Sequence, residues 1–168
     1  SFPEIINPVT GDVCADGEMG ELVFTTLTKE GLPMIRYRTR DLTRLLPGTA
    51  RSMRRMEKIT GRSDDMIILR GVNVFPTQIE EQLLKSEELA PHFQIELVTA
   101  GRMDAMRIIC EANPDSASDD AREVAAQALG KRIKDTVGIS AEVVVGTPGT
   151  APRSEGKAKR VVDLRTKP

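Results

Sequence analysis

Apolar and polar positions follow two different patterns along this chain, and the change comes near residue 64. Before it, residues 21–26 and 34–42 are strand-like, and the stretches at 29–33 and 46–52 carry the glycine and proline of turns. These short strands supply no complete set of core positions. We therefore expect residues 1–62 to be the C-terminal end of a large N-terminal domain, whose sheet or barrel they complete.

After residue 64 the apolar positions become denser. Residues 66–75 are apolar and β-branched, with an interruption at Gly71, which predicts a strand with a break. Thr77 and Glu80 match a capping box, so a helix is predicted to begin there. Its apolar face would consist of Ile79, Leu83 and Leu84.

The remaining pattern completes a second domain. Residues 94–100 and 107–112 flank a turn near Gly101 and predict a β-hairpin, and 141–146 predicts a further strand. Between them, 119–137 has apolar positions at helical spacing and is followed by Gly138 as a stop. The order strand, helix, hairpin, helix, strand indicates an α+β fold, a split βαβ (ferredoxin-like) domain over residues 63–168.

Composition excludes several classes of function. The 168 residues are 39% hydrophobic, and no apolar run approaches the roughly 20 residues of a membrane helix. Two distant cysteines, Cys14 and Cys110, do not make a disulfide framework, and a single histidine, His92, excludes a His-rich metal site. No basic-then-apolar leader opens the chain, which predicts a cytoplasmic location. The chain also opens without Met, as a piece of a longer protein would.

Charge is distributed unevenly. The window 36–62 holds nine Lys or Arg and two acids, so it carries +7 and the remainder −8, for a net charge of −1. Such a window could face phosphates or be a solvated arginine-rich ribbon. Aromatic residues make up only 3%, with no Trp, which argues against a stacking surface for single-stranded nucleic acid.

Three short motifs carry candidate chemistry. Asp41 ends the YRTRD stretch, and a carboxylate accepts hydrogen bonds from two vicinal hydroxyls. The GRSDD turn at 61–65 stands between the two patterns, where a hinge would absorb backbone rotation. Lys157 follows Gly156 but lacks the rest of a phosphate-binding P-loop, which leaves a lysine on a proline- and glycine-rich loop. Taken singly, each also fits an ordinary role: a turn former, a surface ion pair, a solvated lysine.

The order of these motifs along the chain is more specific than any one of them. YRTRD, GRSDD with IILRGVNVFPTQIE, and EGKAKR resemble the C-terminal signatures of the acyl-adenylate-forming ligase superfamily. The stretches RGVNVFPTQIE and PRSEGKAKR are most similar to its phenylacetate–coenzyme A ligase family. The resemblance covers nearly the whole chain. Arg40 stands where many superfamily members have Gly, and Glu155 where many have Ser; both fit the phenylacetate branch.

The resemblance implies a role for each candidate residue. Asp41 would hold the ribose of ATP, and Arg62 would contact the nucleotide. Asp64 would be the hinge pivot, with Asp65 as the alternative. Lys157 would contact the α-phosphate and the substrate carboxylate.

Further along the chain, the resemblance implies a contact with the second substrate. Gly71 and its neighbours, Asn73 among them, would border the coenzyme A channel.

The implied activity is that of an AMP-forming aryl-acid–coenzyme A ligase. A carboxylate and ATP would give acyl-AMP and pyrophosphate, and coenzyme A would then displace AMP. ATP, coenzyme A and Mg²⁺ are the implied cofactors, with Mg²⁺ bound mainly outside this chain. The partners would be small molecules, not nucleic acid or membrane, and family members suggest a homodimer.

Two alternatives stay open: a stand-alone ferredoxin-like module that binds nucleic acid, or a regulatory domain of similar shape. The sequence holds no Gly/Ser/Thr-rich phosphate loop and no acyl pocket, so we expect the isolated chain to be inactive in adenylation. It also leaves the identity of the acid undefined.

Overall fold

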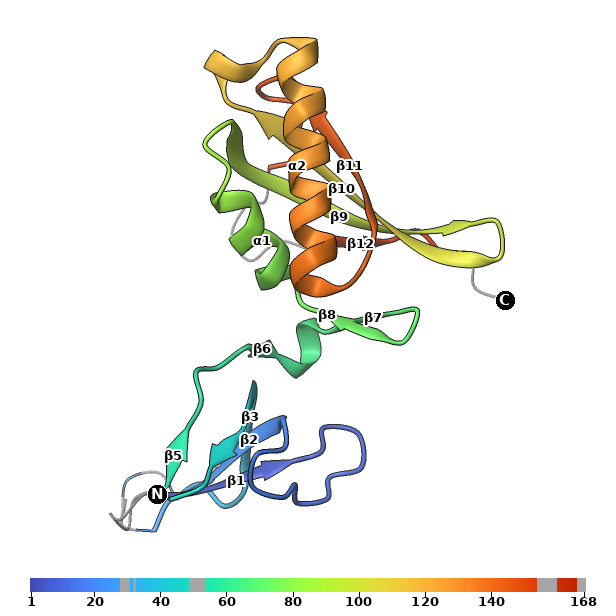
Figure 1. Cartoon of the computed structure of the whole chain (residues 1–168). Coiled ribbons are helices and arrows are strands. Elements are labelled where there is room, and N and C mark those ends of the chain that lie inside the picture. Colours follow the sequence, from blue (N-terminus) through green and yellow to red (C-terminus); the bar gives the residue numbers. More distant parts are fainter. Residues whose placement is uncertain (28–30, 32, 49–53, 154–159, 166–168) are drawn as a thin grey trace. The chain divides into compact units, whose positions relative to one another are not determined.

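The computed structural model describes residues 1–27, 31, 33–48, 54–153 and 160–165 (Figure 1). The chain forms two compact units, Ser1–Met66 and Ile67–Pro168. The division falls after Met66, whereas the sequence placed it after residue 62. Each unit has its own sheet and its own buried residues.

The first unit is built from short antiparallel strands. One sheet has the order β1-β2-β3-β6, with β1 at Phe2–Ile6, β2 at Gly20–Thr25, β3 at Tyr37–Thr43 and β6 at Gly61–Arg62. A second pair joins β4 (Leu45–Leu46) to β5 (Arg55–Met56), and a 3₁₀ turn, η1, spans Ser63–Asp65. Its buried cluster is small and consists of Ile5, Leu22 and Leu45, with Cys14 and Phe24 packed against it.

The second unit is a sheet covered by helices on one face (Figure 1). The sheet order is β11-β10-β9-β12, with β9 at Leu89–Ala100, β10 at Met103–Ala112, β11 at Ala141–Gly146 and β12 at Val161–Asp163. Strands β9 and β10 are antiparallel, and the outer strands are parallel to their neighbours. Helices α1 (Pro76–Leu84) and α2 (Asp119–Val137) bury Ile79, Leu83, Leu129 and Ile133 against it, and η2 spans Pro114–Ser116.

The predicted strand at 66–75 is instead a hairpin. It divides into β7 (Ile67–Leu69) and β8 (Val72–Val74), which pair only with each other. Arg70 and Gly71 have φ values of 50° and 78°, the left-handed pair that closes a two-residue turn. The strand that we expected to join the main sheet is therefore folded back on itself, and β12 occupies the edge beside β9. The fold is mixed α/β with sheets and two helices, and the finer ferredoxin-like prediction is not confirmed.

The predicted helix starts were correct in one case and wrong in the other. Helix α2 begins after Ser118, whose Oγ accepts from Ala121 N–H at 3.3 Å, and ends at Gly138 with φ of 83°. Helix α1 is not capped by Thr77. It begins at Pro76, which has no N–H to satisfy, and the preceding Phe75 N–H donates to Gln78 Oε1 at 3.0 Å.

Cys110 of β10 and Leu84 of α1 have ordinary structural environments. Cys110 is fully buried, and burial raises the pKa of its thiol to about 12, which leaves it unreactive. Leu84, expected on the apolar face of α1, is 61% exposed. Within the described ranges, no helix is both long and apolar enough to cross a membrane.

Candidate functional site

The site in the first unit is built on an irregularity in β3. Register between β2 and β3 shifts so that Glu21 opposes Leu42 while Val23 opposes Arg38. The extra length bulges out at Arg40, which has φ of 68°, a left-handed conformation that favours glycine. Bulges of this kind reorient the side chains beside them.

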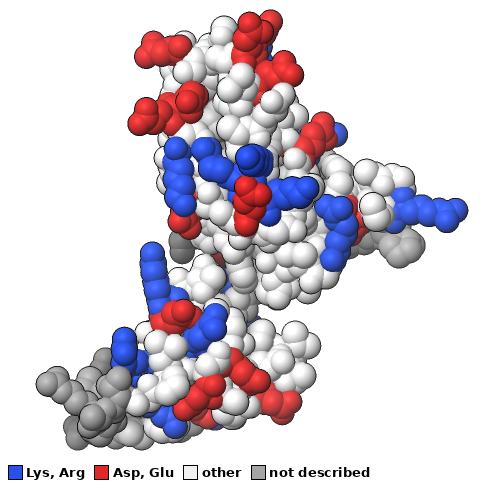
Figure 2. Space-filling view, viewed as in Figure 1, with Lys and Arg blue, Asp and Glu red and all other residues white. Residues whose placement is uncertain are grey.

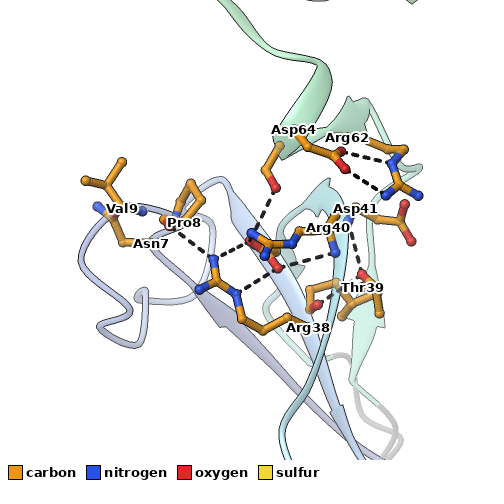
Figure 3. A network of polar contacts seen from close by, with 12 residues as sticks. Asn7, Pro8, Val9, Arg38, Thr39, Arg40, Asp41, Arg62 and Asp64 are labelled. Atoms are coloured by element: carbon orange, nitrogen blue, oxygen red, sulfur yellow. Dashed lines mark hydrogen bonds and ion pairs between the residues drawn. The ribbon is translucent and has the colours of Figure 1, made fainter.

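Hydrogen bonds around Thr39 hold the bulge. The Thr39 hydroxyl donates to the Leu22 carbonyl at 3.0 Å and accepts from Asp41 N–H at 3.1 Å. One side chain thus bridges the neighbouring strand and the residue that follows the bulge (Figure 3). The backbone of Asp41 is fixed as a result.

Glu21 is the centre of a network of polar contacts, of whose members Figure 3 labels Arg38 and Arg40. Its side chain is fully buried, and Arg38 pairs with it at two points, Nε–Oε1 at 3.0 Å and Nη2–Oε2 at 2.7 Å. Glu21 Oε1 also accepts from the bulged Arg40 N–H at 3.3 Å, and Oε2 accepts from Ser63 Oγ at 3.3 Å. One carboxylate therefore ties β2 to the bulge and to the turn that begins at Ser63.

The charge of Glu21 is stabilised by these partners. The hydrogen bond from Arg38 lowers the pKa of Glu21, against the opposing effect of burial, and the nearby cations and the Arg40 N–H add to the lowering. Arg38 also donates to the Pro8 carbonyl at 3.0 Å, which anchors the loop after β1. Glu21 is thus an ionised residue at neutral pH, held in place by four hydrogen bonds from three residues.

Asp41 lies where β3 meets β6, directly opposite Arg62 in the antiparallel pairing. Its side chain is half-buried, and no described residue donates a hydrogen bond to its carboxylate. In Figure 3 that carboxylate points away from Arg38 and Arg40. Asp41 therefore presents two free acceptor oxygens on a fixed backbone.

Arg62 and Asp64 form a closed pair. Arg62 Nε lies 3.0 Å from Asp64 Oδ1, and Nη2 lies 2.9 Å from Oδ2. Both side chains are about half exposed, and the hydrogen bond from Arg62 lowers the pKa of Asp64. The structure brings three predicted residues, Asp41, Arg62 and Asp64, to the end of the first unit, and Asp65 completes the same 3₁₀ turn.

The other predicted residues belong to the second unit. Gly71 forms the tip of the β7–β8 hairpin, where a Cβ would meet nothing within 4 Å, so its φ of 78° is what favours glycine. Asn73 is exposed on β8 and opposes Ile68, which is 59% exposed. Lys157 lies outside the described residues.

Several cations of the basic window at 36–62 are paired with carboxylates within the first unit. Ion pairs join Arg36 to Glu4, Arg38 to Glu21, Arg44 to Glu57 and Arg62 to Asp64. Figure 2 shows acidic and basic side chains intermixed on the visible face of this unit rather than a continuous basic surface. On this face, the first unit therefore lacks the continuous basic surface that the nucleic-acid alternative would use.

Comparison with known proteins decides the family. Residues 71–165 match the model of a family described as AMP-binding enzyme C-terminal domain. The chain belongs to this family. The family of AMP-binding enzyme C-terminal domains thus accounts for the second unit from the hairpin tip to the residues after β12.

Relatives of this family member extend the match to the first unit. The phenylacetate-coenzyme A ligase of Escherichia coli (strain K12) is 57% identical over 166 residues, which are 98% of this chain and 38% of that protein. The chain therefore spans less than half the length of this curated relative.

One solved protein resembles this AMP-binding enzyme C-terminal domain in two states. The 2-hydroxyisobutyryl-CoA ligase in its postadenylation state with 2-HIB-AMP has a TM-score of 0.78 at 27% identity, over 96% of this chain and 35% of that one. The same ligase with 2-HIB-AMP and CoA in the thioesterification state has a TM-score of 0.58 at 28% identity, over 98% and 35%.

Glu21 and Ser63 were missed by reasoning from sequence. The signal available was a single carboxylate at the start of the apolar run 20–25, followed by an arginine-rich strand. A charged residue in a buried strand needs a partner of opposite charge. That argument predicts a pair with an arginine of 36–40 but does not identify Ser63.

Proposed function

We propose that this chain is the C-terminal part of an ATP-dependent aryl-acid–coenzyme A ligase of the phenylacetate type. The observation that carries the proposal is the carboxylate of Asp41, which accepts no hydrogen bond from the described residues and stands on a held backbone beside the Arg62–Asp64 pair, where the first unit ends. The 57% identity to a phenylacetate-coenzyme A ligase over 98% of the chain supports the substrate class.

The first half-reaction would join a carboxylate to the α-phosphate of ATP and release pyrophosphate. Asp41 would accept hydrogen bonds from the two ribose hydroxyls, because its oxygens have no competing donor among the described residues. Arg62 would contact the nucleotide by opening its pair with Asp64. Such a half-exposed pair is held weakly, so an anionic ligand competes for the guanidinium.

Lys157 would act at the point where two anions meet. The attacking carboxylate and the α-phosphate repel each other, and an ammonium between them stabilises the transition state. The second half-reaction, in which the coenzyme A thiol displaces AMP, does not need this cation. A protein that moves the lysine away between the two half-reactions can carry out both of them in one active site.

A hinge at Asp64, with Asp65 as the alternative, would permit that exchange. The related 2-hydroxyisobutyryl-CoA ligase scores 0.78 against this chain in one state and 0.58 in another, although its sequence is the same. That ligase therefore changes shape between the two states within the matched region. The short turn Ser63–Asp65 at the end of the first unit is a suitable place for such a rotation.

Coenzyme A would approach the β7–β8 hairpin. Gly71 leaves the tip without a side chain, and Asn73 presents an exposed amide on β8. Mg²⁺ would enter with ATP and be bound mainly by other parts of the enzyme. The described residues include no group of three or more His, Cys, Asp or Glu that could hold a metal ion by themselves.

The first unit supports the view that this chain is part of a larger body. Its buried cluster contains only three residues, while Val9, Leu27 and Ile35 are 86%, 70% and 82% exposed. We therefore propose that its strands complete a larger nucleotide- and acyl-binding domain. The isolated 168-residue chain should show no acid-dependent ATP–pyrophosphate exchange.

The test is Lys157→Ala in the intact enzyme, with Lys159→Ala as the matched control from the same segment. Adenylation, measured by ATP–pyrophosphate exchange with phenylacetate, should fall about 10²–10³-fold in Lys157→Ala. Thioester formation from supplied phenylacetyl-adenylate should stay near the unmodified rate. Equal loss of both half-reactions, or equal effects of the two lysines, would rule out this division of roles.

A further inference from the structure

Glu111 is a buried carboxylate that none of the predicted roles uses. It lies near the end of β10, opposite Gly146 of β11, and only 2% of its surface is exposed. A buried carboxylate is costly unless donors compensate for lost water. All the donors that compensate Glu111 come from one segment of the chain.

That segment is the connection that follows β11. Glu111 Oε2 accepts from Gly149 N–H and from Ala151 N–H, both at 3.0 Å, and Oε1 accepts from Arg153 Nη2 at 2.8 Å. Burial acts to raise the pKa of Glu111, but the bonds from Arg153 and Ala151 outweigh it and leave the pKa lowered. The carboxylate is therefore ionised, and its charge strengthens three bonds to the same connection.

A second anchor holds the other end of the connection. The Arg160 carbonyl accepts a hydrogen bond from Ile95 N–H of the sheet at 2.7 Å. Its guanidinium lies 2.6 Å from Glu80 Oε1 of α1 and 5.0 Å from the centre of the Phe93 ring. Arg153 and Arg160 are thus both fixed to the rigid body of the second unit.

Between these anchors the sequence contains Lys157, four residues after Arg153 and three before Arg160. We propose that Glu111 is a positioning residue for adenylation. Its contacts hold Gly149, Ala151 and Arg153, which precede the lysine in sequence, and the contacts of Arg160 hold the chain after the lysine. The inference rests on the proposed role of Lys157. Misplacement of a reacting group by about 1 Å is enough to cost on the order of 100-fold in rate.

The first test is Glu111→Gln in the intact enzyme. Gln has the size of Glu but no charge, and its NH₂ group would face an N–H donor from which the carboxylate oxygen had accepted a hydrogen bond. Adenylation should fall about 10- to 100-fold, while thioester formation from supplied acyl-adenylate changes less than about threefold. The matched control is Glu142→Gln, because Glu142 pairs with Arg107 in the same sheet and is 60% exposed. That control should leave both half-reactions unchanged.

A second variant protects the test against misfolding of the first. Arg153→Met removes one partner of Glu111, and the Arg153 side chain is 48% exposed, so the fold should tolerate the change. Arg153→Met should also lower the adenylation rate and leave thioester formation nearly unchanged, but by a smaller factor than Glu111→Gln. Arg107→Met, which removes a 38% exposed arginine from a similar ion pair, is its control.

A readout independent of activity is tryptic cleavage of the folded enzyme after Lys157 and Lys159. Glu111→Gln and Arg153→Met should speed cleavage there severalfold over their controls. A loss of both half-reactions in proportion to a lowered melting temperature would overturn the inference. The inference would also be overturned if Glu111→Gln and Arg153→Met left adenylation and cleavage unchanged while Lys157→Ala abolished adenylation. If Lys157→Ala keeps adenylation, the proposed function fails, and the cleavage rates alone support or overturn the anchoring by Glu111.

Discussion

Arg62 and Asp64 hold each other through two parallel hydrogen bonds of 3.0 and 2.9 Å. The sequence assigned them separate roles, one toward the nucleotide and one at the hinge. Because their charges satisfy each other, a ligand that draws Arg62 away also releases the residue that we propose as the pivot. Nucleotide contact and hinge rotation would then be coupled through one ion pair.

The two adjacent aspartates should therefore differ on substitution. Asp64→Ala frees Arg62, so it should change the ratio of the adenylation rate to the thioester-formation rate in the intact enzyme. Its unfolding free energy should change by at most about 1 kcal/mol, because the pair is half exposed. Asp65→Ala, which breaks no pair with Arg62, should leave the ratio unaltered. If only Asp65→Ala shifts the ratio, the pivot lies there instead.

Glu21 should be important for stability. Glu21→Gln removes the charge that Arg38, Ser63 and the Arg40 N–H share, and we expect a loss of about 2–3 kcal/mol in unfolding free energy. The loss is limited because the Arg38 side chain is 38% exposed and regains water. Urea unfolding measures it. Glu57→Gln, in a pair with both side chains near 40% exposed, is the control and should cost less than about 1 kcal/mol.

The pH dependence of stability follows from two lowered carboxylate pKa values, those of Glu21 and Glu111. Below the ordinary Glu pKa of about 4.3, the unfolded chain binds protons that the folded chain still excludes. The stabilisation by these residues is therefore complete above that pH and is lost as the pH falls through their folded values. The stability difference between the unmodified chain and Glu21→Gln should narrow from pH 6 to pH 3. A constant difference would contradict the lowered pKa of Glu21.

The left-handed conformation of Arg40 gives a prediction with an internal control. Both Arg40→Gly and Arg40→Ala remove the side chain, but only glycine adopts φ of 68° without strain. Arg40→Gly should be more stable than Arg40→Ala by about 1 kcal/mol in denaturant unfolding. At Tyr37, in the regular part of β3, the order should reverse. The same order at both positions would mean that the bulge relaxes when the side chain is lost.

Asp41 should matter for ATP and not for folding. Asp41→Asn replaces an acceptor by a donor where two hydroxyls are proposed to bind, so the KM for ATP should rise about tenfold or more. No described residue donates a hydrogen bond to this carboxylate, and the unfolding free energy should stay within about 0.5 kcal/mol. Asp12→Asn, at an exposed loop position, is the comparison. A stability loss without a change in KM would assign Asp41 to structure.

Helical and hairpin periodicity were sufficient to predict much of the second unit. The ends of α2 and β11 agree with the predicted 119–137 and 141–146, because Ser118 and Gly138 mark the helix ends chemically. The turn at Gly101 lies between β9 and β10 as expected. Local signals succeed where a single residue determines the backbone conformation.

Relations between distant residues could not be predicted in this way. The β7–β8 hairpin depends on Arg70 accepting a left-handed conformation, which residue type alone does not favour. Glu21 meets Ser63 and Glu111 meets Arg153 only because the strands and connections bring them together. In the candidate site, the sequence identified Asp41, Arg62 and Asp64 individually but not the ion pair between two of them.

The sheet order β11-β10-β9-β12 also sets the distance that the connection from β11 to β12 has to span. Because β11 and β12 run in opposite directions, their connection starts and finishes at the same end of the sheet. Three strand spacings amount to about 14 Å. Residues 147–160, fully extended, would reach roughly 46 Å. Topology alone therefore leaves a large surplus of chain. A constraint on the length of this connection comes instead from the contacts that its residues make, such as those of Gly149, Ala151 and Arg153 with Glu111.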